Sequence, residues 1–240
     1  MIVLSADGAA EGALWHALFD LADRTGDWTL IGARMVQLHA AAAGRTLLRT
    51  SLDGDVLADA RTEPNAVRRV AEILLAEDFM LEEPSYMGVG HTFVKGSVEI
   101  DLLAPEHLGS QSEDARTTVR GAHTVEVPGG RQALARTERV AVRVGRREGT
   151  VPRPDLLGSI LLKARAVDVD DVPDNQRSDL AVLLSLVVDP DPLVAQLRGQ
   201  ERQWIGRRRE LDDPGATAWR GLRPDDAARG LAALRQLAGW

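Results

Sequence analysis

Two aspartates, Asp53 and Asp55, are the residues of this sequence that could most directly carry out chemistry. Side chains two residues apart on a β-strand project from the same face, about 7 Å apart, so these two carboxylates could share divalent cations. The same Asp53-Gly54-Asp55 tripeptide, flanked by apolar residues, is also a good signal for a hairpin turn that binds nothing. Taken alone, the tripeptide favours the turn, so the residues before it decide between the two interpretations.

The segment before the two acids predicts a strand followed by a helix. Trp28–Ile31 is an apolar run of strand length, Gly32 interrupts it, and Ala33–Ala43 carries apolar residues at helical spacing. Gly44 stands where a helix C-cap glycine is expected. The start of a helix offers free N–H groups and a positive dipole end to phosphate oxygens. The strand, the glycine, the helix start and the two acids together indicate a site for a metal-bound phosphate ligand.

This order of elements resembles the signature of the nucleotidyltransferase superfamily. In that signature a hydrophobic residue, a glycine and a small residue open a helix, and two acids separated by a hydrophobic residue follow it. The sequence is most similar to the small bacterial proteins of the AbiEii type, which include the toxins of type IV toxin–antitoxin pairs. The resemblance covers residues 28–190 of the chain, which is most of its length.

The resemblance implies roles for the residues at the start of the helix. Gly32 and Ala33 would form a phosphate cradle, and Arg34 would add positive charge to it. The sequence departs from the family pattern at two positions. Ala33 stands where glycine or serine is usual, which removes a possible hydroxyl contact, and Gly54 stands where the family has a hydrophobic residue between its acids.

A third acid is expected on a neighbouring strand. The segment Val98–Leu102 alternates apolar and acidic residues and supplies Asp101, with Glu99 on the same face as its rival. Asp101 best fits the third position of the family, which implies that it shares the catalytic metal and acts as a base toward an attacking hydroxyl. The alternative is an edge-strand acid that only faces water.

Lys163 is placed unusually for a lysine. It shares a predicted helix face with Leu156, Ile160 and Val167, and a buried ammonium needs an anionic partner. Asp179 lies in a similar position on the next predicted helix, and AbiEii-type proteins resemble this arrangement. The resemblance implies that Lys163 contacts the triphosphate and that Asp179 supports the site, whereas the simpler reading is a structural ion pair.

Composition describes an ordinary globular protein. The 240 residues carry a formal net charge of -7, which argues against indiscriminate binding of nucleic acid. There is no cysteine, which excludes disulfides, thiolate catalysis and cysteine-based zinc sites. Nothing resembles a signal peptide or a membrane span, so a cytoplasmic location is expected. Only Lys95 and Lys163 are lysines among the 29 basic residues.

Hydrophobic periodicity predicts an α/β protein with a helical C-terminal region over residues 151–240. The resemblance implies that residues 1–150 form a nucleotidyltransferase-like core. The core would contain a short mixed sheet flanked by helices. Its predicted elements are helices over 9–24 and 64–76, a hairpin over 91–102 with its turn near Gly96, a loop over 106–121, and strands over 125–127 and 140–144. The predicted helices of the C-terminal region span 155–167, 176–188, 193–211 and 224–237.

The predicted metal–phosphate site together with the resemblance implies a metal-dependent enzyme that moves a nucleoside monophosphate from a nucleoside triphosphate (NTP) to an acceptor hydroxyl, with Mg²⁺ or Mn²⁺ as cofactor. RNA is the acceptor that the toxin-like resemblance implies, and a cognate antitoxin is the implied protein partner. One alternative is a nucleotidyltransferase for a small cationic molecule such as an aminoglycoside. Another is a degenerate member that binds a nucleotide or a partner without catalysis.

One C-terminal segment could contact RNA directly. Residues 198–210 carry five arginines against two acids, with Trp204 among them. Arginines can grip phosphates while an indole stacks on a base. The alternative, an amphipathic helix with a solvated basic face, is the more common meaning of such a segment.

Overall fold

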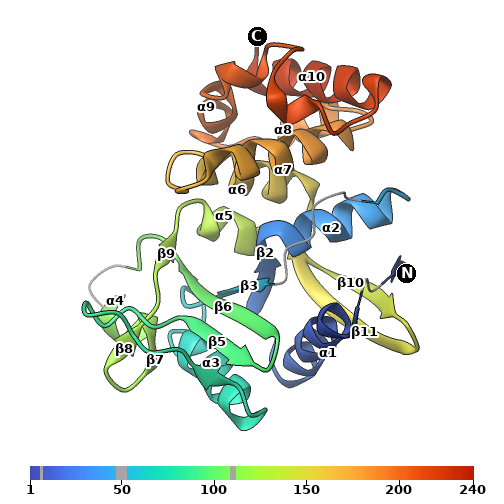
Figure 1. Ribbon diagram of the computed structural model, residues 1–240. Coiled ribbons are helices and arrows are strands. Elements are labelled where there is room, and N and C mark those ends of the chain that lie inside the picture. The colour runs from blue at the N-terminus through green and yellow to red at the C-terminus, as the bar shows by residue number, and fades with distance from the viewer. Residues whose placement is uncertain (6–7, 47–52, 109–111) are drawn as a thin grey trace.

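The chain folds into mixed β-sheets and helices, which confirms the predicted α/β class. The computed structural model describes residues 1–5, 8–46, 53–108 and 112–240. In Figure 1 the strands and the first helices occupy the lower part of the molecule, and the C-terminal helices stack above them.

The larger sheet carries the candidate residues. Its strands are β2 (Trp28–Ile31), β3 (Asp53–Ala58), β4 (Met80–Leu81), β5 (Thr92–Lys95) and β6 (Val98–Pro105), and β9 (Glu126–Val127) pairs with the end of β6. The spatial order is β2-β3-β6-β5-β4. β3 is antiparallel to β2 and parallel to β6, so β3 is an interior strand with a partner on each side. The predicted hairpin is confirmed, because β5 and β6 pair antiparallel around Gly96.

A smaller sheet lies beside the first. Its strands are β1 (Ile2–Leu4), β10 (Thr137–Val144) and β11 (Arg147–Pro154), with β10 in the middle. The sequence predicts only the part of β10 over residues 140–144. β11 escapes prediction because its polar sequence ends in two prolines, which a strand tolerates at the edge of a sheet. A separate two-stranded pair is formed by β7 (Thr117–Val119) and β8 (Ala122–His123).

Helices cover both faces of the larger sheet. α1 (Ala9–Arg24) matches its predicted bounds, and α2 (Gly32–Ala42) and α3 (Ala66–Ala76) confirm the next two predicted helices within two residues. The prediction of a loop over 106–121 is wrong in part, because α4 (Ser112–Arg116) and β7 lie within it; residues 109–111 of that range are outside the described part of the chain. α5 (Gly130–Ala135) is a further short helix that periodicity could not predict.

The C-terminal region is helical, as predicted. It contains α6 (Leu156–Ala166), α7 (Pro173–Ser185), α8 (Asp191–Gln196), α9 (Glu201–Gly206) and α10 (Pro224–Ala238). The prediction of a single helix over 193–211 is wrong, because the range holds most of α8, then α9 and the 3-10 helix η2 (Arg209–Leu211). The bend between α8 and α9 includes Gly199, which adopts a positive φ of 49°. No helix of the described ranges is long and apolar enough to cross a membrane.

The helical region shares a hydrophobic core with the larger sheet. Ile31, Met35 and Leu57, from β2, α2 and β3, belong to the same buried cluster as the leucines of α6, α7 and α10. His39 of α2 strengthens this contact, since its Nε2 lies 2.9 Å from Ser159 Oγ and 3.1 Å from the carbonyl of Pro154. β11 runs to Pro154, past the predicted boundary at 150, before α6 begins.

Candidate metal centre

Three aspartates meet on one face of the larger sheet. Asp53 and Asp55 lie on β3, and Asp101 lies on the adjacent parallel strand β6, directly opposite Asp55 in the register. One carboxylate oxygen from each of the three lies within 4.8 Å of the others. The predicted convergence of the three acids is confirmed, and the hairpin-turn interpretation of Asp53-Gly54-Asp55 is wrong because these residues form the first half of β3.

Gly54, the departure between the two acids, has a structural reason. Residue 54 points to the opposite face of β3, toward α1, where a Cβ atom would lie 3.0 Å from Leu14 Cδ1. Leu14 is fully buried and occupies the space that a side chain at residue 54 would need. The strand keeps its pairing to both neighbours, so both carboxylates still point to the other face.

Gly32 holds the start of α2 against Asp55. Its φ of +66° lies in the left-handed region, which glycine adopts without strain. A Cβ atom at residue 32 would also overlap the carboxylate of Asp55, with Oδ2 the nearest atom. Gly32 and Ala33, the predicted phosphate cradle, therefore lie beside the acids at a helix N-terminus, where backbone N–H groups lack intrahelical acceptors.

Asp55 is the electrostatic centre of the cluster. Burial raises its pKa from 3.8 to about 7, and the negative charge of Asp53 acts in the same direction. Asp101 and Asp179 raise the pKa further, whereas the positive charge of Lys163 opposes the shift. Three carboxylates that repel one another at this spacing favour either a bound proton or a bound cation.

Asp101 is oriented by a neighbour that sequence reasoning missed. Thr92 Oγ1 on β5 donates a hydrogen bond of 2.6 Å to Asp101 Oδ1. The hairpin register places Thr92 opposite Asp101, so the turn at Gly96 was a signal that could have identified it. Glu99, the rival of Asp101, is exposed and lies outside the three-carboxylate group. Its pKa is raised by partial burial and by the charges of Asp101, Asp53 and Glu82.

Lys163 and Asp179 form the buried ion pair that the sequence predicts. Lys163 Nζ lies 2.8 Å from Asp179 Oδ2, and the two residues are 3% and 6% exposed. Gln176 is a second partner that sequence reasoning missed: its Oε1 accepts a hydrogen bond of 2.8 Å from Lys163 Nζ, and its Nε2 donates to Asp170 Oδ2 at 2.5 Å. The pair lies close enough to Asp55 for the charge of Lys163 to lower, and that of Asp179 to raise, the pKa of that carboxyl.

Arg34 does not occupy the predicted position in the phosphate cradle. Its guanidinium is 1% exposed, pairs with Glu11 of α1, and donates to Gln37 Oε1 at 2.8 Å. It also lies 5.9 Å from the ring of Trp15. The side chain turns toward α1 because position 34 falls on the buried face of α2. Arg34 is thus a core residue, and the prediction of its role in phosphate binding is corrected.

The basic C-terminal segment is likewise occupied by intramolecular contacts. Arg208 is 5% exposed and donates to Asp168 Oδ1 at 2.5 Å. Trp204 is half-buried beneath the guanidinium of Arg165, 5.3 Å from the ring centroid, and Arg209 stacks on Trp240 at 3.9 Å. The indole that could have stacked on a base is therefore engaged within the protein.

The three acids suit a hard divalent cation. Within the described residues, Asp53, Asp55 and Asp101 form no salt bridge, although arginines pair with many other acids of this chain. Carboxylate oxygens are the ligands that Mg²⁺, Mn²⁺ and Ca²⁺ prefer. The donor set and its spacing thus fit a metal ion held by Asp53, Asp55 and Asp101. Comparisons of the chain with protein-family models, curated proteins and solved structures find no match.

Replacement of Gly32 by alanine should disturb the acids specifically. Gly32 and Gly44 stand at opposite ends of α2 with nearly equal φ values of +66° and +69°. A Cβ atom added at Gly32 would overlap Asp55, whereas one added at Gly44 would meet no atom within 4 Å. Gly44→Ala, the matched control, should cost about 1 kcal/mol of backbone strain. Gly32→Ala should cost at least about 2 kcal/mol more, measured by urea unfolding, since Asp55 must move. If the two variants lost the same free energy of unfolding, the close approach of Gly32 to Asp55 would be contradicted.

Asp55→Asn should stabilise the protein in a pH-dependent manner. Native Asp55 keeps its proton up to about pH 7, whereas the unfolded chain loses it near 3.8, so the unfolding free energy of the parent falls as pH rises between these values. Asparagine has no such titration. The variant should gain about 4 kcal/mol relative to the parent at pH 8 and little at pH 4. Exposed Asp171→Asn is the control, and a gain independent of pH would refute the interpretation.

Proposed function

We propose that this protein is a metal-dependent nucleotidyltransferase that moves a nucleoside monophosphate from an NTP to an acceptor hydroxyl. The observation that supports this proposal is the juxtaposition of three carboxylates, which form no salt bridge with any described residue, with a helix N-terminus opened by Gly32. A cation site next to free backbone N–H groups suits a triphosphate, whose oxygens need both kinds of partner. The proposal places Mg²⁺ or Mn²⁺ on Asp53, Asp55 and Asp101.

Each residue has a distinct task in the proposed reaction. A bound divalent cation would neutralise charge on the triphosphate and on the reacting oxygens. The backbone N–H groups of Gly32 and Ala33 would bind phosphate oxygens and orient the α-phosphorus. Lys163, fixed by Asp179 and Gln176, would contribute positive charge at the same opening. Positioning and charge neutralisation would then supply most of the acceleration.

Asp101 would act as the base. Thr92 donates to its Oδ1 and so fixes the carboxylate plane. As the acceptor oxygen forms its bond to the α-phosphorus, the bond from that phosphorus to the bridging oxygen breaks and pyrophosphate leaves. The acceptor proton passes to a carboxylate oxygen of Asp101. Asp101 is assigned as the base because the strand register places it directly across from Asp55. The rival Glu99 is more exposed and is not assigned this role.

The acceptor belongs to one of two classes. RNA is the acceptor expected of a toxin-like enzyme, and a cognate antitoxin would then be its partner. Glu99 is largely exposed, and its pKa is raised by partial burial and by the negative charges of Asp101, Asp53 and Glu82. This gathering of negative charge favours the alternative of a small cationic acceptor such as an aminoglycoside. Transfer assays with α-labelled NTPs should therefore offer both RNA and amine-rich sugars.

Ligand-dependent stabilisation tests the proposed site without knowledge of the acceptor. Mg²⁺ together with a non-hydrolysable NTP should raise Tm, because a ligand at 100 times its Kd adds about 2.7 kcal/mol. Asp53→Asn and Asp101→Asn should abolish this increment, measured against each variant's own ligand-free Tm. Asp171→Asn, an exposed control, should keep it. An absent increment in the parent protein, or an unchanged increment in both site variants, would reject the proposal.

The structural and the functional roles of Lys163 can be tested separately. Lys163→Met should lose about 3 kcal/mol of stability, because it deprives buried Asp179 of its ammonium partner. The double variant Lys163→Met/Asp179→Leu should recover most of that loss, as apolar replacement of a buried pair often does. We expect the double variant to remain without nucleotide transfer and without the NTP-dependent Tm increment. Recovery of both would show that the pair is only structural.

A further inference from the structure

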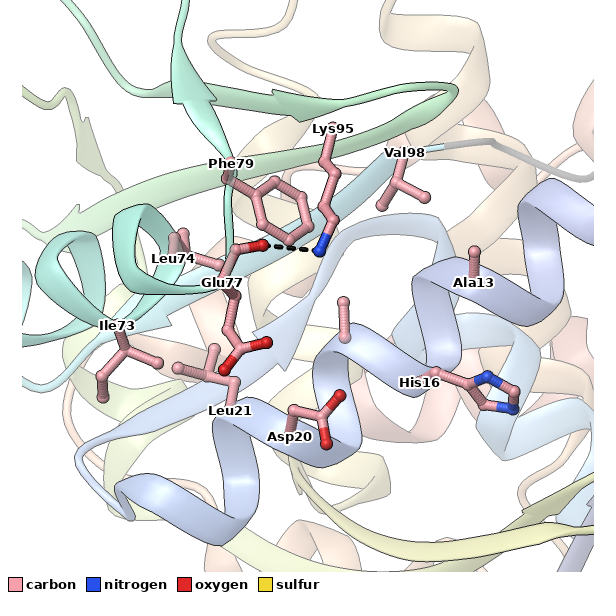
Figure 2. Close-up of a pocket in the computed structure, with 11 residues that line it drawn as sticks. Ala13, His16, Asp20, Leu21, Ile73, Leu74, Glu77, Phe79, Lys95 and Val98 are labelled. Atoms are coloured by element: carbon pink, nitrogen blue, oxygen red, sulfur yellow. Dashed lines mark hydrogen bonds between the residues drawn. The ribbon is translucent and has the colours of Figure 1, made fainter.

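A cavity of about 260 Å³ lies on the other face of the larger sheet from the three aspartates. It is enclosed by α1, the end of α3 and the β5–β6 hairpin, as Figure 2 shows. Val98, which lines it, alternates along β6 with Glu99 and so points away from the acidic face. The cavity is therefore separate from the candidate metal centre, and an inference about it is independent of the proposed function.

Most of the cavity wall is apolar. Ala13 and Ala17, one turn apart on α1, leave the hollow because their side chains are short. Leu21, Leu74 and Phe79 are buried around it, so the wall is built from side chains anchored in the core. A volume slightly below the range of about 300–1,000 Å³ that drug-sized ligands occupy suits a small ligand with an apolar body.

The charged residues at the rim of the cavity differ in whether they form salt bridges. Asp20 pairs with Arg147, and Glu77 pairs with Arg24. Lys95 is exposed and forms no salt bridge with any carboxylate of the described chain. Its Nζ donates to the carbonyl oxygen of Glu77 at 2.6 Å and lies 5.8 Å from the Phe79 ring centroid, as Figure 2 illustrates.

These contacts hold the ammonium of Lys95 at the mouth of the cavity with donor capacity left over. An ammonium has three N–H donors, and one is used by Glu77. The chain otherwise prefers arginine, which suits planar carboxylate partners within the protein, whereas a lysine is a compact charge on a flexible stem. The nearby carboxylates of Asp20 and Glu77 would repel a multiply charged anion, so one negative charge matches this rim.

We propose that the cavity binds a small monocarboxylate with an aromatic or short aliphatic body. The carboxylate accepts a hydrogen bond from Lys95 Nζ, and the body packs on Ala13, Ala17 and Phe79. Apolar burial supplies the affinity, and Lys95 supplies the preference for an anion.

Phenylbutyrate and its uncharged counterpart phenylbutanol, titrated against the full chain by ligand-observed NMR, test this proposal. The parent should bind phenylbutyrate saturably and more tightly than phenylbutanol. Lys95→Met should weaken phenylbutyrate roughly three- to tenfold, since it loses one charged hydrogen bond near the surface, and should leave phenylbutanol unchanged. Arg120→Met, which removes an exposed charge at the β7–β8 turn, is the matched control and should bind both as the parent does.

Variants that fill the cavity provide a second test of the proposal. Ala17→Phe should abolish binding of both compounds, and Ala13→Phe, at a more exposed position of the same helix face, serves if Ala17→Phe does not fold. Absence of saturable phenylbutyrate binding to the parent overturns the proposal. It is also overturned if Lys95→Met binds phenylbutyrate as tightly as the parent, or if the filled variants still bind it. None of these measurements involves nucleotide, so they stand apart from the test of transferase activity.

Discussion

The repulsion among Asp53, Asp55 and Asp101 is the constraint that the surrounding structure must accommodate. A carboxylate whose pKa is raised to about 7 by burial and by like charges destabilises the fold whenever it is ionised. The arrangement persists because β3 pairs on both sides and cannot turn its acids away. Gly32 allows α2 to start directly against Asp55, and Leu14 fills the space behind Gly54. Functional sites commonly retain such unfavourable groups at a cost in stability.

The C-terminal helices contribute to the same site while they complete the fold. α6 and α7 share the core that also contains Ile31 and Leu57. The same packing that completes the fold therefore fixes the position of Lys163 relative to β2 and β3. Its charge reduces the repulsion on Asp55 but cannot cancel it, because the ammonium is shared with Asp179 and Gln176. A partly compensated cluster leaves room for a cation in a way that a fully paired one would not.

The sequence predicts the parts of this arrangement that depend on local pattern. Helical spacing identifies α1 and α2, strand alternation places Asp101 on β6, and the apolar face of α6 marks Lys163. Contacts between distant segments lie beyond such patterns. Arg34 pairs with Glu11, 23 residues earlier, and this decides its orientation. β11 is a strand because β10 offers it an edge, and no alternation in Arg147–Pro154 reveals that partner.

The same distinction bears on the proposal of nucleotidyl transfer, because Ala33 and Gly54 differ from the pattern that the sequence resembles. Behind Gly54 the space that a side chain would need is already filled by Leu14 of α1. The departure at Gly54 therefore gives no reason to regard the site as degenerate, since both carboxylates keep their direction. Ala33 lacks only a side-chain hydroxyl, and the backbone N–H groups at a helix start do not depend on it. The degenerate alternative has to be supported by loss of cation binding, because the spacing of the three carboxylates is the property on which that binding depends.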